Sequence, residues 1–160
     1  MTWLPSAVVE LVEAALVTEL SVVRPDGRPM TYPLIPLWDG ERIVMTSSVL
    51  FSRKLEHIAV NPRVSVSVTD PVSVGGRTDR ITIQGDAKVI AEDPHGGWER
   101  LLPIWSAKEP AIVAFLEERV ALPLFFERAL IEITPRRVLY WPGGDTSKAP
   151  AVTNVTREAA

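Results

Sequence analysis

Residues 39–68 read DGERIVMTSSVLFSRKLEHIAVNPRVSVSV, and this stretch contains the strongest structural signals in the chain. Asp39-Gly40 is typical of a two-residue hairpin turn, because such a turn needs positive φ at both central positions. The β-branched run that follows predicts a strand over residues 42–46. The stretch therefore begins with the second half of a β-hairpin.

A short helix and another strand are predicted in the rest of this stretch. Ser52 can cap the free amides of a helix over residues 53–60, and Asn61-Pro62 would end that helix. Val and Ser then alternate over residues 64–68, which is the pattern of a strand with one buried face.

The segments on the N-terminal side extend this pattern into an antiparallel meander. Apolar residues at helical spacing predict an amphipathic helix over residues 6–17. Two short apolar runs, residues 20–24 and 30–38, predict strands joined by a turn at Pro25-Asp26-Gly27.

The segments on the C-terminal side predict more strands with helices between them. A strand is expected over residues 80–91, and helices over 97–106 and 111–120. A last pair of strands, residues 130–134 and 137–141, is expected to turn at Pro135-Arg136. The small polar residues that follow predict a flexible tail over 145–160. Because no β-α-β alternation occurs, the fold class is α+β with a small antiparallel barrel.

The composition limits the classes of function. The chain has 160 residues, no cysteine and a formal charge of -3, which together indicate one domain without disulfides. The acidic balance gives no general attraction to nucleic acid or anionic membranes. The first twenty residues lack a basic leader and carry three glutamates, so neither a signal peptide nor a membrane span is expected. A cytoplasmic location is the prediction.

The sequence contains few candidate catalytic residues. His57 and His95 have no metal-ligand partner at helical spacing, so we expect ordinary surface or capping residues and no metal site. The nucleophile elbow, the phosphate loop and the dinucleotide fingerprint are all missing from the sequence. Hydrolase, nucleotide-triphosphatase and dinucleotide-domain functions therefore have no support, and no catalytic residue can be named.

Hydroxyl and cationic side chains gather around the predicted short helix. Thr46-Ser47-Ser48 ends one strand, and Ser52-Arg53-Lys54 starts the helix. Hydroxyls, amides, an Arg fork and a Lys charge together suit a phosphate dianion. The alternative is a serine-capped helix with two solvated cations.

Tryptophan is the second unusual feature. Trp98 and Trp105 lie at helical spacing, which favours a packing role. Trp141 ends a strand and enters Pro142-Gly143-Gly144, where an aromatic ring could flank a planar ligand.

The order of these segments resembles the pyridoxamine 5'-phosphate oxidase-like family of flavin proteins. The specific part is Ser52-Arg53-Lys54 followed by Asn61-Pro62-Arg63-Val64-Ser65. Gly85-Asp86-Ala87 resembles the family's Gly-x-Ala, and Trp141-Pro142-Gly143-Gly144 resembles its closing Trp-x-Gly-Gly. The resemblance covers about residues 20–144.

This resemblance implies a six-stranded Greek-key split β-barrel in one domain, residues 1–144. It also implies a homodimer with two flavin mononucleotide (FMN) sites between the subunits. Carried over residue by residue, it places the phosphate on Arg53 and Lys54 and the flavin beside Met45 and Thr46. The strand over residues 31–36 would run along the ring, and its pocket would be lined by Trp38 or Trp141 and by the helical insert over 93–122. The remaining cofactor-binding residues expected are Ser47, Ser52, Arg80 and, from the partner subunit, Trp141.

Departures from the family pattern narrow the function. The oxidase's substrate-binding Lys is replaced by Pro36, and its C-terminal Arg-Leu-His-x-Arg motif is missing. The prediction is an FMN-dependent oxidoreductase that transfers a hydride to or from another small molecule, and not a vitamin B6 oxidase. The alternatives are a deazaflavin-dependent reductase, for which Arg24, Arg28, Arg77 and Arg80 are the candidate cations, and a non-catalytic flavin- or haem-binding module.

Overall fold

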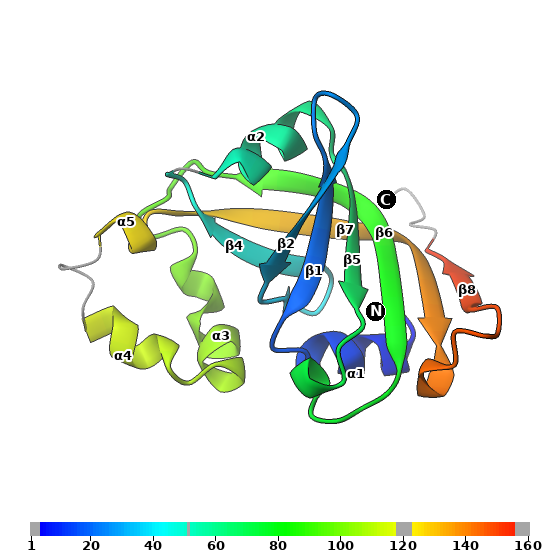
Figure 1. Cartoon of the computed structure of the whole chain (residues 1–160). Helices are drawn as coiled ribbons and strands as arrows, with labels where there is room; N and C mark the ends of the chain where they lie inside the picture. Colours follow the sequence, from blue (N-terminus) through cyan, green and yellow to red (C-terminus); the bar gives the residue numbers. More distant parts are fainter. Residues whose placement is uncertain (1–3, 51, 118–122, 156–160) are drawn as a thin grey trace.

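One antiparallel sheet forms the body of the molecule and curls into a half-open barrel (Figure 1). The computed structural model describes residues 4–50, 52–117 and 123–155. Within this part the spatial order is β2-β1-β5-β6-β7-β4-β3, and β8 pairs with β7 outside that order. The strands are β1 (Thr18–Val23), β2 (Pro29–Leu34), β3 (Leu37–Trp38), β4 (Ile43–Ser48), β5 (Arg63–Val68), β6 (Arg80–Ile90), β7 (Arg128–Trp141) and β8 (Ala151–Asn154).

Short helices connect and cover these strands. They are α1 (Ser6–Ala14), α2 (Arg53–Val60), α3 (Leu102–Lys108), α4 (Ile112–Glu117), α5 (Pro123–Phe126) and the single turns η1 (Val72–Val74), η2 (Glu99–Leu101) and η3 (Pro142–Gly144). The predicted α+β split barrel with an N-terminal helix and inserted helices is confirmed. The predicted number of six strands is too low, because β3 and β8 are separate strands.

Alternating side chains decide which face of the sheet points inward. In β5, Val64, Val66 and Val68 are buried, and the serines between them are half-buried on the outer face. β1 shows the same alternation of buried and half-buried residues. The period of two in the sequence is therefore a true signal of a one-sided core.

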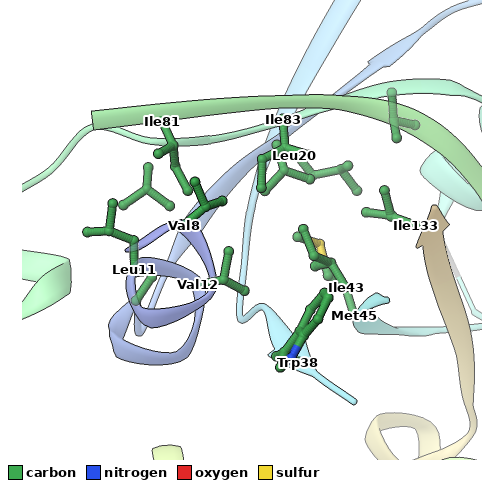
Figure 2. Close-up of a cluster of buried hydrophobic side chains, with 14 of the residues drawn as sticks. Val8, Leu11, Val12, Leu20, Trp38, Ile43, Met45, Ile81, Ile83 and Ile133 are labelled. Atoms are coloured by element: carbon green, nitrogen blue, oxygen red, sulfur yellow. The ribbon is translucent and has the colours of Figure 1, made fainter. Parts of the chain in front are cut away.

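Helix α1 closes one end of the barrel. Val8, Leu11 and Val12 are fully buried and point toward side chains of the sheet, including Leu20 and Ile81 (Figure 2). Each such burial stabilises the fold by about 1.5–3 kcal/mol. The helix is thus part of the core, as its apolar spacing predicted.

A second core lies between the sheet and the helices at the left of Figure 1. Trp98 is fully buried, stacks on Phe126 at 5.7 Å between ring centroids, and donates a hydrogen bond from Nε1 to the Phe126 carbonyl. Trp105 meets Trp98 edge to face at 6.1 Å. The predicted packing role of both tryptophans is confirmed, and it fixes helix α3 against the barrel.

The two strands expected at residues 130–134 and 137–141 are one continuous strand, so the predicted turn at Pro135-Arg136 is wrong. Pro135 faces Gly85 of β6, where the register shifts between Gln84 and Gly85. A Cβ on Gly85 would lie 2.5 Å from the Thr134 carbonyl oxygen. Proline is tolerated in a strand at such a bulge, because its missing N–H falls where the ladder is already interrupted.

The hairpin at Asp39-Gly40 also differs from the expected two-residue turn. Trp38 faces Ile43, so four residues form the loop. Asp39 Oδ1 accepts hydrogen bonds from the Glu41 and Arg42 amides at 2.9 and 2.7 Å, and Gly40 has φ of 99°. This loop therefore does not need positive φ at two central positions, because hydrogen bonds to the Asp39 side chain hold it.

Part of the expected C-terminal tail is ordered. Residues 151–154 form β8, which pairs with residues 137–140 of β7. The sequence predicts no strand in this region, because four mostly exposed residues show no apolar period. The prediction of a tail without structure is thus wrong for β8.

Candidate functional site

Side chains from β4 and the start of α2 form one hydrogen-bonded cluster. Ser47 Oγ and Ser52 Oγ share a hydrogen bond of 2.7 Å. Lys54 Nζ donates to both hydroxyls, at 3.0 and 3.1 Å. Ser52 makes no side-chain cap to the helix, so the predicted capping role is wrong. Its hydroxyl is used by the cluster instead, which brings three of the predicted site residues together.

Lys54 is a half-buried cation in this cluster. Its ammonium lies 4.9 Å from the centroid of the Tyr32 ring. Burial lowers the pKa of Lys54 from its usual value, and the nearby positive charge of Arg128 lowers the pKa further. No carboxylate of the described residues pairs with Lys54. An anion bound here would relieve both effects.

Arg128, at the start of β7, supplies a second cation that the sequence analysis did not select. Its Nε donates to Thr46 Oγ1 at 2.9 Å, and Nη1 donates to the Phe125 carbonyl at 2.9 Å. Its guanidinium lies over the Phe125 ring at 4.7 Å and the Trp105 ring at 5.3 Å. Burial lowers the pKa of Arg128 to about 10, so the side chain stays charged at neutral pH. Thr46, a predicted site residue, thereby contacts this second cation.

A small cavity adjoins Arg128. Its volume is about 170 Å³, and apolar side chains form most of its wall. Arg128 and Thr46 are its polar members. The other lining residues are Val17, Pro33, Leu34, Ile35, Leu37 and Trp105. We call this space the Arg128 cavity. Trp105 from the helical insert lines it, whereas Trp38 is buried elsewhere.

A larger cavity, of about 400 Å³, lies over β1, β5 and β6. It is lined by Arg136, whose Nε donates to Asp86 Oδ2 at 2.6 Å. That arginine is already neutralised by a carboxylate. The other cation that lines this cavity, Arg63, is exposed to solvent, so the Arg128 cavity with its partly buried cation is the better candidate for an anionic ligand.

Met45 and Arg53 do not join the cluster with their side chains. Met45 is fully buried in the barrel core, so only its backbone can face a ligand (Figure 2). Arg53 is exposed and lines a separate cavity of about 400 Å³ together with Arg24 and His57. Within one chain, Arg53 thus lines a cavity to which the adjacent Lys54 does not contribute.

Arg80 and Trp141 lie at the far end of the sheet. They face each other in the register of β6 and β7. Trp141 ends β7 and Arg128 begins it, and Figure 1 shows these two ends on opposite sides of the molecule. Trp141 Nε1 donates to the Lys148 carbonyl at 3.2 Å. The Nε atom of Arg80 is buried and has no hydrogen-bond partner among the described residues. One chain alone does not bring this pair to Lys54.

The histidines are placed differently from each other. His57 is buried rather than on the surface, and its Nδ1 has no partner in the described part of the chain. His95 is exposed, and its Nδ1 lies 2.8 Å from Glu127 Oε1.

Within residues 4–50, 52–117 and 123–155, no three His, Cys, Asp or Glu side chains are grouped to hold a metal. Over the same residues, no helix combines the length and apolar character needed to cross a membrane.

Sequence reasoning missed Arg128 because nothing local marks it. It precedes the apolar run of β7 and lies 82 residues from its hydroxyl partner Thr46. A cation at the start of an apolar strand is the only signal, and it is a weak one. The contact depends on the pairing of β4 with β7, in which Thr46 faces Leu130 and Ser48 faces Arg128.

The model of the pyridoxamine 5'-phosphate oxidase family matches residues 4–142. This match spans most of the chain and confirms the resemblance found in the Ser-Arg-Lys and Asn-Pro-Arg-Val segments. No curated protein sequence matches the chain.

Solved structures with this fold include several kinds of protein. The chain is similar to an F420 reductase with 25% identity and a TM-score of 0.62, covering 84% of this chain and 98% of that one. An FMN-binding protein related to pyridoxamine 5'-phosphate oxidase, from Nostoc punctiforme, is 16% identical with a TM-score of 0.60 and 97% coverage of both chains. A heme-binding protein from Mycobacterium smegmatis is 18% identical with a TM-score of 0.57, covering 94% of this chain and 59% of that one.

Proposed function

Because the chain belongs to the pyridoxamine 5'-phosphate oxidase family, we propose that it binds FMN and acts as an oxidoreductase on a small molecule. The observation that supports this most is the pair of partly buried cations, Lys54 and Arg128, beside three hydroxyls and without a carboxylate partner among the described residues. Buried charges are normally paired, so we expect anionic groups of bound ligands to neutralise Lys54 and Arg128.

The donor set around Lys54 fits the phosphate of FMN. Lys54 provides a point charge, and Ser47 and Ser52 provide hydroxyl donors that can turn from each other toward a phosphate oxygen. When bound, FMN supplies the hydride-transfer chemistry. The chain's residues then bind the phosphate, and the apolar wall of the Arg128 cavity excludes water from the reacting groups.

A homodimer is the second part of the proposal. Arg80 and Trp141 lie at the opposite end of β7 from Lys54, so a second copy must supply them if they belong to one site. Large apolar side chains near the Arg128 cavity are also exposed. Val17 is 38% exposed and Phe125 is 39% exposed. Exposed apolar surface of this kind is typical of a protein interface.

A deazaflavin cofactor is the alternative, and one observation favours it. The F420 reductase shares 25% identity over 98% of its length, a higher identity than the FMN-binding protein from Nostoc punctiforme. Both cofactors carry a phosphorylated side chain and a planar ring. The Lys54 cluster therefore suits either one.

Titration of the purified full-length chain with each cofactor tests this function. We expect quenching of FMN fluorescence with a stoichiometry of one FMN per chain, and a dimer by light scattering. Saturable binding of F420 without FMN binding would replace FMN by the deazaflavin. Failure of both cofactors to bind would overturn the proposal, and a Soret band in the purified protein would indicate haem instead.

A further inference from the structure

The guanidinium of Arg128 is held in one orientation, and one of its nitrogen atoms makes no hydrogen bond with the described residues. Thr46 Oγ1 accepts from Nε and the Phe125 carbonyl accepts from Nη1. Nη2 donates to no residue that the structure describes. The Phe125 and Trp105 rings flank the guanidinium at 4.7 and 5.3 Å. A planar cation fixed by two acceptors and two rings is oriented before a ligand arrives.

The surroundings of Arg128 select against a phosphate. The polar groups of the Arg128 cavity are one guanidinium and one hydroxyl, and its other walls are Val17, Leu34, Leu37 and similar apolar groups. A phosphate dianion has three terminal oxygens, and some of them would face these walls without a donor. A small apolar acid has two carboxylate oxygens, which match the polar residues of the cavity, and an apolar body, which matches the apolar walls.

We propose that the Arg128 cavity binds the carboxylate of a small apolar acid and that Arg128 is the specificity-determining residue for this substrate class. The proposal rests on the function proposed above, in which Lys54, Ser47 and Ser52 take the cofactor phosphate. The two anion sites are distinct in chemistry: hydroxyl-rich around Lys54 and apolar around Arg128. The cavity volume of about 170 Å³ limits the acid to a small one, since sites for drug-sized ligands occupy roughly 300–1,000 Å³.

Calorimetric titration of the full-length chain with sodium benzoate and with benzamide tests the proposal. The two probes share a planar apolar body, and only benzoate carries the charge. We expect benzoate to bind at least about tenfold more tightly than benzamide, because a charge-assisted hydrogen bond is lost with the neutral probe. Arg128→Met should weaken benzoate binding by a similar factor and leave benzamide unchanged. Arg136→Met is the matched control, because it removes an exposed arginine that already has a carboxylate partner.

The outcomes separate this proposal from the cofactor assignment. Equal affinity for benzoate and benzamide in the unmodified chain would overturn the carboxylate site, and this comparison needs no variant to fold. Displacement of benzoate by FMN in direct competition would overturn it as well, since Arg128 would then belong to the cofactor site. If benzoate binds as expected and neither FMN nor F420 binds, the carboxylate site stands and the proposed redox function fails.

Discussion

Lys54 Nζ lies 3.0 Å from Ser47 Oγ, so the first turn of α2 is joined to the end of β4 by a direct side-chain contact. This contact fixes the ammonium against the sheet rather than leaving it in solvent. Because Lys54 and Arg128 both lack carboxylate partners in the described part of the chain, the end of β4 has a positive potential that a bound anion would balance.

Replacing Lys54 by Met should weaken FMN binding by at least about tenfold, because one charge-assisted contact to phosphate is lost. The free energy of unfolding should stay the same or rise, since burial already disfavours the charge of Lys54. Fluorescence titration with FMN and urea unfolding measure the two quantities separately. Lys148→Met is the control, because Lys148 is 80% exposed and pairs with Asp145. Equal FMN affinity in Lys54→Met and the unmodified protein would contradict the phosphate assignment.

Mixing two variant chains, each lacking one residue of the site, should restore FMN binding if the site lies between subunits. Lys54→Met and Arg80→Met should each bind FMN weakly as homodimers. When the two chains are unfolded together and refolded, random pairing should give tight binding in about one quarter of the sites, because each mixed dimer has one intact site. Stoichiometry from fluorescence titration measures this fraction. No recovery would mean that both residues act within one chain or that Arg80 has no part in the site.

The segments with local signals were predictable from the sequence. The alternation in β5, the apolar face of α1 and the helix after Ser52 each depend on neighbours within a few residues. The Ser-Arg-Lys segment likewise predicted the cluster of Ser47, Ser52 and Lys54.

What could not be predicted depends on pairing between distant segments. Pro135 is typical of a turn, and only its partner Gly85, fifty residues earlier, allows it inside β7. Arg128 becomes a site residue only because β7 pairs with β4 and brings it to Thr46. Strand β8 follows from the free edge that β7 offers to it, and not from its own residues.

Gly85→Ala should destabilise the protein by about 1–3 kcal/mol, the usual cost of forcing an extra group into a packed site. The added Cβ would lie 2.5 Å from the Thr134 carbonyl oxygen, and a backbone atom cannot move aside as a side chain can. Urea unfolding measures the change. Gly96→Ala is the matched control, since its Cβ meets only the flexible Asp93 side chain at 3.1 Å. If the two variants unfold at the same urea concentration, the close approach at the bulge does not constrain β7.

The stability of the protein should rise with pH between about 8 and 10.5 through Lys108. Burial lowers the pKa of Lys108 to about 8, and the charge of Glu13 opposes this shift only in part. Between the folded pKa and the unfolded value of 10.5, the unfolded state binds more protons, so raising the pH favours the folded state. Below pH 8 both states are protonated and the contribution is constant.

Urea unfolding at pH 7.5, 8.5 and 9.5 tests the role of Lys108, because one group contributes at most about 1.4 kcal/mol per pH unit. Nζ of Lys108 donates to the carbonyls of Val12 at 2.7 Å and of Pro36, and so joins α3 to α1 and to the segment before β3. Lys108→Met should reduce the rise with pH, while the smaller contribution of Lys54 remains. Since Tyr140 has a raised pKa and opposes the trend as it begins to ionise, the measurement stops at pH 9.5. An identical pH dependence in Lys108→Met would show that another group carries the effect.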